Sequence, residues 1–362
     1  MTITPQQIET TLEQIVDPTT GKDYVTSKAL RDVRIDHDQV MVEIELGYPA
    51  RSVLENVRQQ VAEALQAIPG IGPVTVNVTS QIIAHSAQRG LKLVPGVKNI
   101  IAVASGKGGV GKSATAVNLA LALAAEGAAV GILDADIYGP SQPQMLGVSG
   151  RPDSPDGKTI EPMRAHGIQM MSIGLLIDAE TPMVWRGPMV TQALQQLLND
   201  TLWHDLDYLV IDLPPGTGDI QLTLAQKIPV TGAVIVTTPQ DIALLDARKG
   251  LKMFEKVGIP ILGIVENMGL HTCSQCGHTE PIFGTGGGDK MCRDYNVELL
   301  GTLPLDIKIR EHTDAGTPSV VAEPEGQIAI TYRTIARRVA AKVSDLSKDY
   351  SEVFTQIIME DD

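Results

Sequence analysis

Cysteine is scarce in this chain, which has only three among its 362 residues. Long apolar runs are also missing, because no uninterrupted run reaches the roughly 18 residues that a membrane-spanning helix needs. The N-terminal segment, residues 1–5, has no basic flank followed by an apolar core, so it does not resemble an export signal. We therefore expect a soluble, cytoplasmic protein with no membrane partner, in which a disulfide is the least favoured use of the thiols.

Basic residues are in short supply as well. The 29 Lys and Arg residues are outnumbered by 43 Asp and Glu residues, and the formal net charge is -14. Binding to nucleic acid relies on clustered Lys and Arg that neutralise phosphates, so we expect no nucleic-acid partner. Length and a hydrophobic content of 43% are sufficient for one large core and a small extra domain.

Residues 1–83 have the pattern of a small α+β domain. Helices are expected near residues 5–15 and over 53–68, where apolar residues recur at helical spacing. The expected order is a helix, two strands, a helix and another strand. Alternating apolar residues indicate that the second and last strands are half-buried: Val40, Val42, Ile44 and Leu46 in one, and Val74, Val76 and Val78 in the other. Residues 84–96 lack a clean period and are predicted to be a linker.

From residue 97 onward, short apolar strands alternate with helices. This order is typical of an α/β fold with a mostly parallel sheet covered by helices on both faces. Strands are expected over residues 99–105, 129–134, 208–212, 233–237, 261–266 and 298–301. We predict one α/β domain over residues 97–347, followed by an acidic tail at 348–362, with the functional loops at the carboxyl ends of the strands.

A complete phosphate-binding loop follows the first of these strands. It reads Gly106-Lys107-Gly108-Gly109-Val110-Gly111-Lys112-Ser113 and runs through Ala114 into a helix rich in Ala and Leu. Glycines at these positions let backbone N–H groups surround a phosphate. Lys112 is expected to reach the terminal phosphates and Ser113 to bind Mg²⁺, so we predict ATP and Mg²⁺ as cofactors. Lys107, from spacing alone, is a solvated surface charge.

Acidic residues end two of the predicted strands. Asp134 and Asp136 follow the second strand, where a carboxylate can hold Mg²⁺ through water or orient an attacking water. Asp136 is the preferred water-orienting residue and Asp134 the second candidate, although Asp136 could also only cap the next turn. Asp212 ends a strand of Walker B form and is expected in the Mg²⁺ shell, and the Pro- and Gly-rich residues 213–219 after it have the composition of a nucleotide-sensing switch.

Two of the three cysteines, Cys273 and Cys276, form a Cys-x-x-Cys pair. Thiolates at this spacing can bind a metal, act as a redox pair or do neither. Structural zinc needs four ligands, which His271, His278 and Cys292 could complete within one chain. A symmetric dimer would instead bring four thiolates together, the ligand set of a 4Fe-4S cluster.

These motifs together resemble the Mrp/ApbC-type family of iron-sulfur cluster carriers, deviant P-loop ATPases related to the nitrogenase iron protein and to septum-site and partition ATPases. The resemblance rests on residues 106–113, 134–141, 185–188, 211–219, 266–268 and 282–284, with Cys273 and Cys276. Trp185 and Arg186 match the family and receive no catalytic role. The front domain is similar, more loosely, to the small domain of iron-sulfur assembly proteins; no cysteine precedes Cys273, so we expect this domain to dock partners or restrain the ATPase.

The resemblance implies a homodimer in which Lys107 reaches the partner's nucleotide and Asn267 contacts adenine with its amide. It also implies a 4Fe-4S cluster shared by Cys273 and Cys276 of two subunits. The expected activity is slow, Mg-dependent ATP hydrolysis, and the expected partners are apo iron-sulfur proteins and the iron-sulfur assembly machinery.

Two other functions stay open. A septum-site or partition-type positioning ATPase shares the nucleotide motifs but needs a face that seeks membrane or DNA. A C-terminal apolar stripe with basic neighbours is the candidate for that face, although such a stripe more often packs against a sheet. The stripe comprises Ile328, Tyr332, Ile335, Val339, Val343 and Leu346, beside Arg333, Arg337, Arg338 and Lys342. The second alternative is a zinc-stabilised ATPase regulator.

Overall fold

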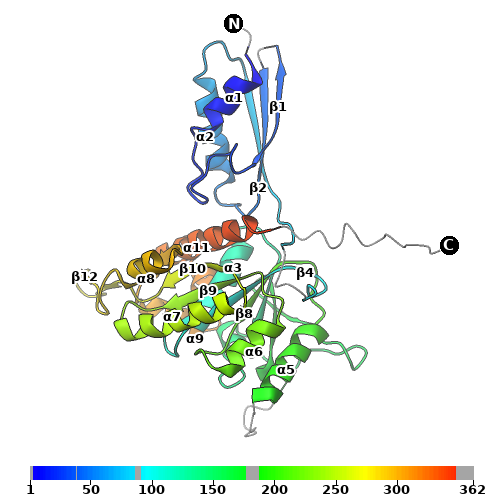
Figure 1. The fold of residues 1–362 in the computed structure, drawn as a ribbon, viewed down its shortest axis with the longest axis vertical. Coiled ribbons are helices and arrows are strands. Elements are labelled where there is room, and N and C mark those ends of the chain that lie inside the picture. The colour runs from blue at the N-terminus through cyan, green and yellow to red at the C-terminus, as the bar shows by residue number, and fades with distance from the viewer. Residues whose placement is uncertain (1–2, 38, 86–90, 177–186, 348–362) are drawn as a thin grey trace, which may run out of the picture.

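The computed structural model describes residues 3–37, 39–85, 91–176 and 187–347. A small α+β part stands on a larger α/β part, close to the C-terminal end of helix α11 (Gln327–Ser344), as Figure 1 shows.

The small part has the predicted order of elements: α1 (Pro5–Leu12), β1 (Leu30–Asp36), β2 (Gln39–Leu46), α2 (Leu54–Gln66) and β3 (Val74–Ser80). The strand order is β1-β2-β3, with β2 antiparallel to β1 and parallel to β3. Thr4 and Gln7 form a capping box that starts α1. The alternating apolar residues of β2 are buried in one core with both helices, which confirms the predicted α+β pattern.

The large part is built on an eight-stranded sheet with the order β13-β10-β9-β4-β8-β5-β7-β6. Neighbouring strands pair in parallel except at the β6 edge, where β6 is antiparallel to β7, so the mostly parallel prediction is confirmed. The strands are β4 (Val97–Ala104), β5 (Val130–Asp134), β6 (Met163–Ala165), β7 (Ile168–Ser172), β8 (Leu206–Asp212), β9 (Gly232–Thr237), β10 (Ile261–Glu266) and β13 (Leu299–Thr302).

Helices cover both faces of this sheet. Helices α3 (Lys112–Ala125) and α11 share one core with the small part, whereas α5 (Gly187–Asp200), α6 (Asp219–Lys227), α7 (Asp241–Lys256) and α8 (Gly287–Tyr295) pack on the other face. Three shorter helices are α4 (Gln142–Met145), α9 (Ile307–Asp314) and α10 (Ser319–Ala322), and β11 (His271–Thr272) and β12 (Thr279–Glu280) form a separate hairpin. Among the described helices, none is long and apolar enough to cross a membrane.

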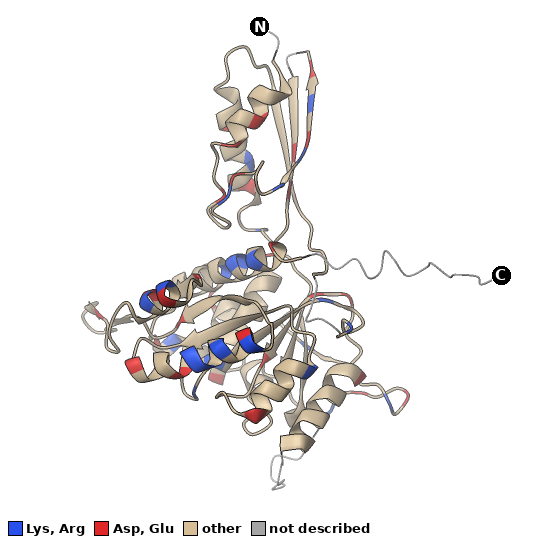
Figure 2. Ribbon diagram, viewed as in Figure 1, with Lys and Arg blue, Asp and Glu red and all other residues tan. Residues whose placement is uncertain are grey.

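The C-terminal apolar stripe lies in the core. Tyr332, Ile335, Val339 and Val343 are buried, and α11 packs on α3, β10 and β13. Its basic residues lie among acidic ones (Figure 2), and Lys342 pairs with Glu298 at 2.5 Å. The packing interpretation of the stripe is therefore confirmed, and the described helix has no free apolar face to offer to a lipid surface.

Glu126, which ends helix α3, joins the two parts. Its carboxylate is fully buried and accepts hydrogen bonds from Ser52 N (3.0 Å), Ser52 Oγ (2.6 Å) and Arg337 Nη1 (2.7 Å). Its carbonyl oxygen accepts another from Arg51 N at 3.0 Å. A carboxylate at the C-terminal end of a helix faces the negative end of the dipole, so it depends on these donors. The phosphate-loop helix thus connects the nucleotide loop directly to the small part.

Replacing Glu126 by Ala is expected to destabilise the protein by about 3 kcal/mol, because breaking a buried pair leaves one charge without its partner. Arg337, whose side chain is only 12% exposed, would be that charge. Urea unfolding measures the change, and limited proteolysis should show easier cleavage between the parts. Glu325→Ala is the control. Glu325 pairs with Arg333, which lies on α11 as Arg337 does, but the Glu325 side chain is 85% exposed. Equal stability losses in the two variants would contradict the assignment.

Candidate nucleotide site and cysteine hairpin

The phosphate-binding loop lies between β4 and α3, as predicted. Gly109 (φ 81°) and Gly111 (φ 82°) adopt left-handed backbone that favours glycine. Gly106 packs so closely on α7 that a Cβ would lie 2.1 Å from the carbonyl carbon of Asp246. Helix α3 begins at Lys112, two residues before Ala114, so Lys112 and Ser113 belong to its first turn. The positive end of the helix dipole therefore faces the loop.

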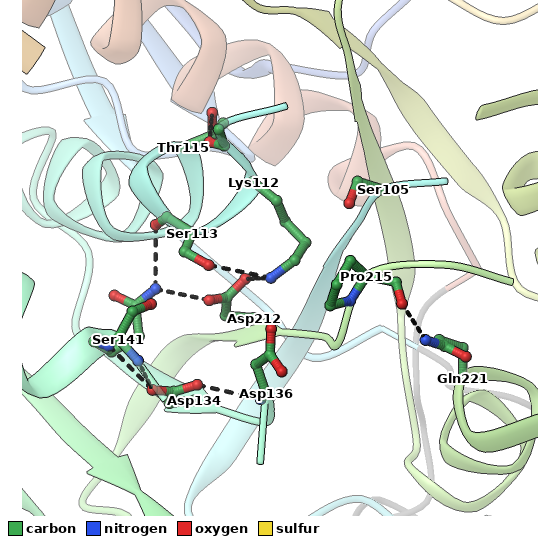
Figure 3. A network of polar contacts seen from close by, with 12 residues as sticks. Ser105, Lys112, Ser113, Thr115, Asp134, Asp136, Ser141, Asp212, Pro215 and Gln221 are labelled. Carbon is green, nitrogen blue, oxygen red and sulfur yellow. Dashed lines mark hydrogen bonds and ion pairs between the residues drawn. The ribbon is translucent and has the colours of Figure 1, made fainter. Parts of the chain in front are cut away.

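Lys112, Ser113 and Asp212 come together at this loop (Figure 3). Lys112 Nζ pairs with Asp212 Oδ1 and lies 3.2 Å from Ser113 Oγ. The side chains of Lys112 and Asp212 are 5% and 0% exposed. A serine hydroxyl and a buried carboxylate are oxygen donors of the kind that Mg²⁺ prefers, so the residues present fit a magnesium ion. A phosphate bound at the loop would compete with Asp212 for the Lys112 ammonium group.

Asp134 holds the segment that follows β5. Its Oδ2 accepts from Ser141 N (2.9 Å), Gln142 N (3.0 Å) and Ser172 Oγ (3.1 Å), and its Oδ1 accepts from Asp136 N (3.2 Å). Burial and the charge of Asp212 raise the pKa of Asp134 to about 7, against these donors, which favour the charged form. Both oxygens are engaged, so Asp134 is placed to hold the segment rather than to orient water.

Asp136 is the more accessible carboxylate. It is half-buried and lies beside Asp212 in Figure 3. Burial raises its pKa, and the positive charge of Lys112 acts in the opposite direction. Asp136 therefore lies near the charges that would meet the terminal phosphate.

Asn267, just after β10, contacts the phosphate-binding loop through its side chain. Its Nδ2 donates to Val110 O at 2.9 Å, and a Cβ on Gly111 would lie 2.2 Å from that nitrogen. One amide hydrogen is used in this contact, which leaves the second hydrogen and Oδ1 for a base. Lys107 is half-exposed in the loop, and its carbonyl oxygen accepts from Ser105 Oγ at 2.9 Å. Trp185 and Arg186 lie outside the described residues.

The two cysteines of the Cys-x-x-Cys pair lie on the tip of the β11–β12 hairpin. Cys273 N donates to His278 O (2.8 Å), and Gly277 N donates to Cys273 O (2.9 Å). Cys276 is exposed and Cys273 partly so. Backbone N–H groups of Cys276 and Gln275 hold the pKa of the Cys273 thiol below its ordinary value, which favours the thiolate form that binds metal. The hairpin thus leaves the Cys276 thiol exposed to solvent and the Cys273 thiol partly exposed.

Comparison with known proteins identifies the family to which this chain belongs. Residues 96–340 match the ParA family model described as NUBPL iron-transfer P-loop NTPase, and residues 5–78 match the model described as iron-sulfur cluster assembly protein. An iron-sulfur cluster carrier protein of Escherichia coli (strain K12) is 55% identical over 334 residues, which cover 92% of this chain and 90% of that protein. The chain belongs to the iron-sulfur cluster carrier family of P-loop NTPases.

Other relatives of this family agree. The iron-sulfur cluster transfer protein NUBPL of Mus musculus is 50% identical over 254 residues, covering 70% of this chain and 80% of that protein. A nucleotide-binding protein from Archaeoglobus fulgidus, solved in complex with ADP and with cobalt, is 38% identical, with a TM-score of 0.56; the match covers 65% of this chain and 91% of that chain. The resemblance to Mrp/ApbC-type carriers is confirmed.

The single-chain zinc site considered for this family member is not formed by its described residues. Within them, no group of three or more His, Cys, Asp or Glu is arranged to hold a metal. Cys292 is buried in the core on α8, and burial raises its pKa to about 11. His271 lies at the base of the hairpin, with Nδ1 2.9 Å from Leu305 O. The described structure therefore does not bring Cys292 together with the hairpin cysteines.

Proposed function

We propose that this chain is an ATP-binding carrier that holds a 4Fe-4S cluster between two subunits and transfers it to apoproteins. The observation that carries the proposal is the hairpin, which exposes two thiols where a cluster needs four ligands. Two copies related by a twofold axis would supply Cys273 and Cys276 twice. The Escherichia coli carrier protein and the mouse transfer protein, which are similar to this chain, support an iron-sulfur cluster as the cargo.

The nucleotide site lies next to the cysteine hairpin along the chain. Strand β10 ends at Glu266, Asn267 contacts the phosphate-binding loop, and Cys273 follows six residues later. A change in the loop on ATP binding can therefore reach the hairpin through one short segment. This proximity supports coupling between ATP and the cluster, with the iron-sulfur assembly machinery and apo iron-sulfur proteins as partners.

Hydrolysis of ATP is assigned to the residues around the loop. Lys112 binds the terminal phosphates, and Asp136 orients the attacking water. Lys107 of each subunit is proposed to reach the nucleotide of its partner in the homodimer. Mg²⁺, held by Ser113 and Asp212, would neutralise phosphate charge. Asn267 is proposed to contact adenine with the part of its amide that Val110 leaves free.

Changing Asp136 to Asn is expected to slow hydrolysis about 100-fold, the lower end of what a positioned proton acceptor contributes. The affinity for ATP should change less than about threefold, since the amide keeps the shape of the side chain. Phosphate release and equilibrium binding of a fluorescent ATP analogue measure the two quantities. Asp153→Asn, at an exposed carboxylate outside the site, should match the wild type.

The pH profile offers a second check on Asp136. Its pKa is raised, so the wild-type rate should fall with decreasing pH at higher pH than an ordinary aspartate would give. The contribution of Asp136 to the acidic limb should be missing from Asp136→Asn, whereas protonation of Asp134, whose pKa burial raises to about 7, should affect both proteins alike. Normal turnover in this variant would assign water orientation to another group.

Cluster transfer tests the proposed function directly. Protein loaded anaerobically with iron and sulfide is mixed with an apoenzyme that requires a 4Fe-4S cluster, in the presence of an iron chelator. Recovery of the apoenzyme's activity at a rate that depends on ATP is the expected result. If only free iron and sulfide restore activity, and chelator blocks all recovery, the carrier function is wrong.

A further inference from the structure

Gln142, which the sequence did not single out, connects three parts of the nucleotide site. It is the first residue of α4 and is fully buried. Its Nε2 donates to Asp212 Oδ2 at 2.9 Å and to Ser113 O at 3.1 Å. Its backbone N donates to Asp134 Oδ2 at 3.0 Å. One residue therefore links the segment after β5, the end of β8 and the first turn of α3.

Asp212 is held by two side chains in the described part of the protein: Lys112 at Oδ1 and Gln142 at Oδ2. If Lys112 turned to a bound phosphate, Oδ1 of Asp212 would be available to a magnesium ion. Gln142 would then remain as the side chain that fixes the carboxylate. We propose that Gln142 is a positioning residue, which keeps Asp212 and Ser113 aligned for Mg²⁺ once Lys112 has left; the assignment rests on the Mg-ATP function proposed above.

Packing alone does not account for an amide at this position. Gln142 Oε1 is buried and has no hydrogen-bond partner among the described residues. A buried amide oxygen without a partner lowers stability by about 1–3 kcal/mol. Leucine or methionine at a purely apolar position would avoid this loss. The polar contacts of the side chain are made by Nε2, which donates to Asp212 Oδ2 and Ser113 O. Both acceptors belong to residues that fit a magnesium ion. Groups behind metal ligands commonly change metal affinity about 10- to 100-fold when they are removed.

Nucleotide titrations of Gln142→Met test this role, since methionine keeps the length of the side chain and removes the donor. ADP affinity is measured with excess Mg²⁺ and with EDTA, and free Mg²⁺ is titrated at fixed ADP. We expect the affinity in EDTA to stay within about twofold of the wild type. The free Mg²⁺ required for half-maximal binding should rise at least about tenfold. Gln144→Met is the matched control, because Gln144 lies in the same short helix but is exposed.

The outcomes distinguish a failure of the positioning role from a failure of the proposed function. A wild-type Mg²⁺ titration in Gln142→Met would overturn the positioning role while leaving the proposed function intact. Equal loss of affinity with and without Mg²⁺ would mark Gln142 as structural and also overturn it. Failure of the wild type to bind nucleotide would overturn the proposed function, and this assignment with it. Gln142→Leu, titrated in the same way, replaces the methionine variant if that variant does not fold.

Discussion

Replacing Lys112 by alanine is expected to weaken ATP binding at least about 100-fold, which corresponds to roughly 2.7 kcal/mol. The ammonium group is the cation that the loop offers to the terminal phosphates. The same change removes the buried partner of Asp212, whose side chain is 0% exposed. Breaking such a pair costs about 3–5 kcal/mol because one buried charge is left uncompensated. Loss of nucleotide binding should therefore come with loss of stability.

Two measurements separate these effects in the Lys112 variant. Isothermal titration with ATP gives the affinity at a temperature where circular dichroism shows the variant folded, and urea unfolding gives the stability. Lys249→Ala is the control, because Lys249 is 58% exposed and pairs with Asp246 on the surface of α7. A Lys112 variant that binds ATP normally would contradict the assignment of the phosphate site.

Replacing both Cys273 and Cys276 by alanine is expected to abolish cluster binding entirely and to leave ATP affinity unchanged. The thiolates are the proposed ligands, whereas the bonds from Cys273 N to His278 O and from Gly277 N to Cys273 O, which close the hairpin, use backbone atoms. The hairpin should therefore keep its fold without the sulfurs. Iron and sulfide analysis after reconstitution measures the first effect, and ATP titration measures the second.

Cys292→Ala provides the matched control for the double variant. Cys292 is buried on α8 and makes no metal group with other described residues. This variant should keep a full cluster while losing some stability, because a small apolar group is removed from the core. Loss of the cluster in Cys292→Ala, or its retention in the double variant, would contradict the proposed ligand set.

Local chemistry made the phosphate-binding loop and the cysteine pair predictable from the sequence. Gly109 and Gly111 are required by left-handed backbone, and Lys112 and Ser113 follow at fixed spacing. Six strands of the large sheet were also predicted, because each is a short, continuous apolar run. Strands β6 and β7 were missed; β6 has only three residues, and buried Gln169 and Ser172 interrupt the apolar pattern of β7.

Long-range contacts explain what the sequence could not predict. Asp134 was a candidate for water orientation, but its partners include Ser141 N and Gln142 N, and backbone donors leave no pattern in a sequence. Gln142 lies 70 residues from Asp212, and Ser52 lies 74 residues from Glu126. A single polar residue carries no sign of a partner at that separation. Such contacts emerge only when the fold brings distant segments of the chain together.

The measurement that tests the central claim most directly is the content of iron, acid-labile sulfide and zinc after anaerobic reconstitution, combined with the native mass of the loaded protein. We predict about four iron and four sulfide per two chains, a charge-transfer absorption band and a dimeric mass. About one zinc per chain without that band, or a cluster on a monomer, would contradict a cluster held between two subunits.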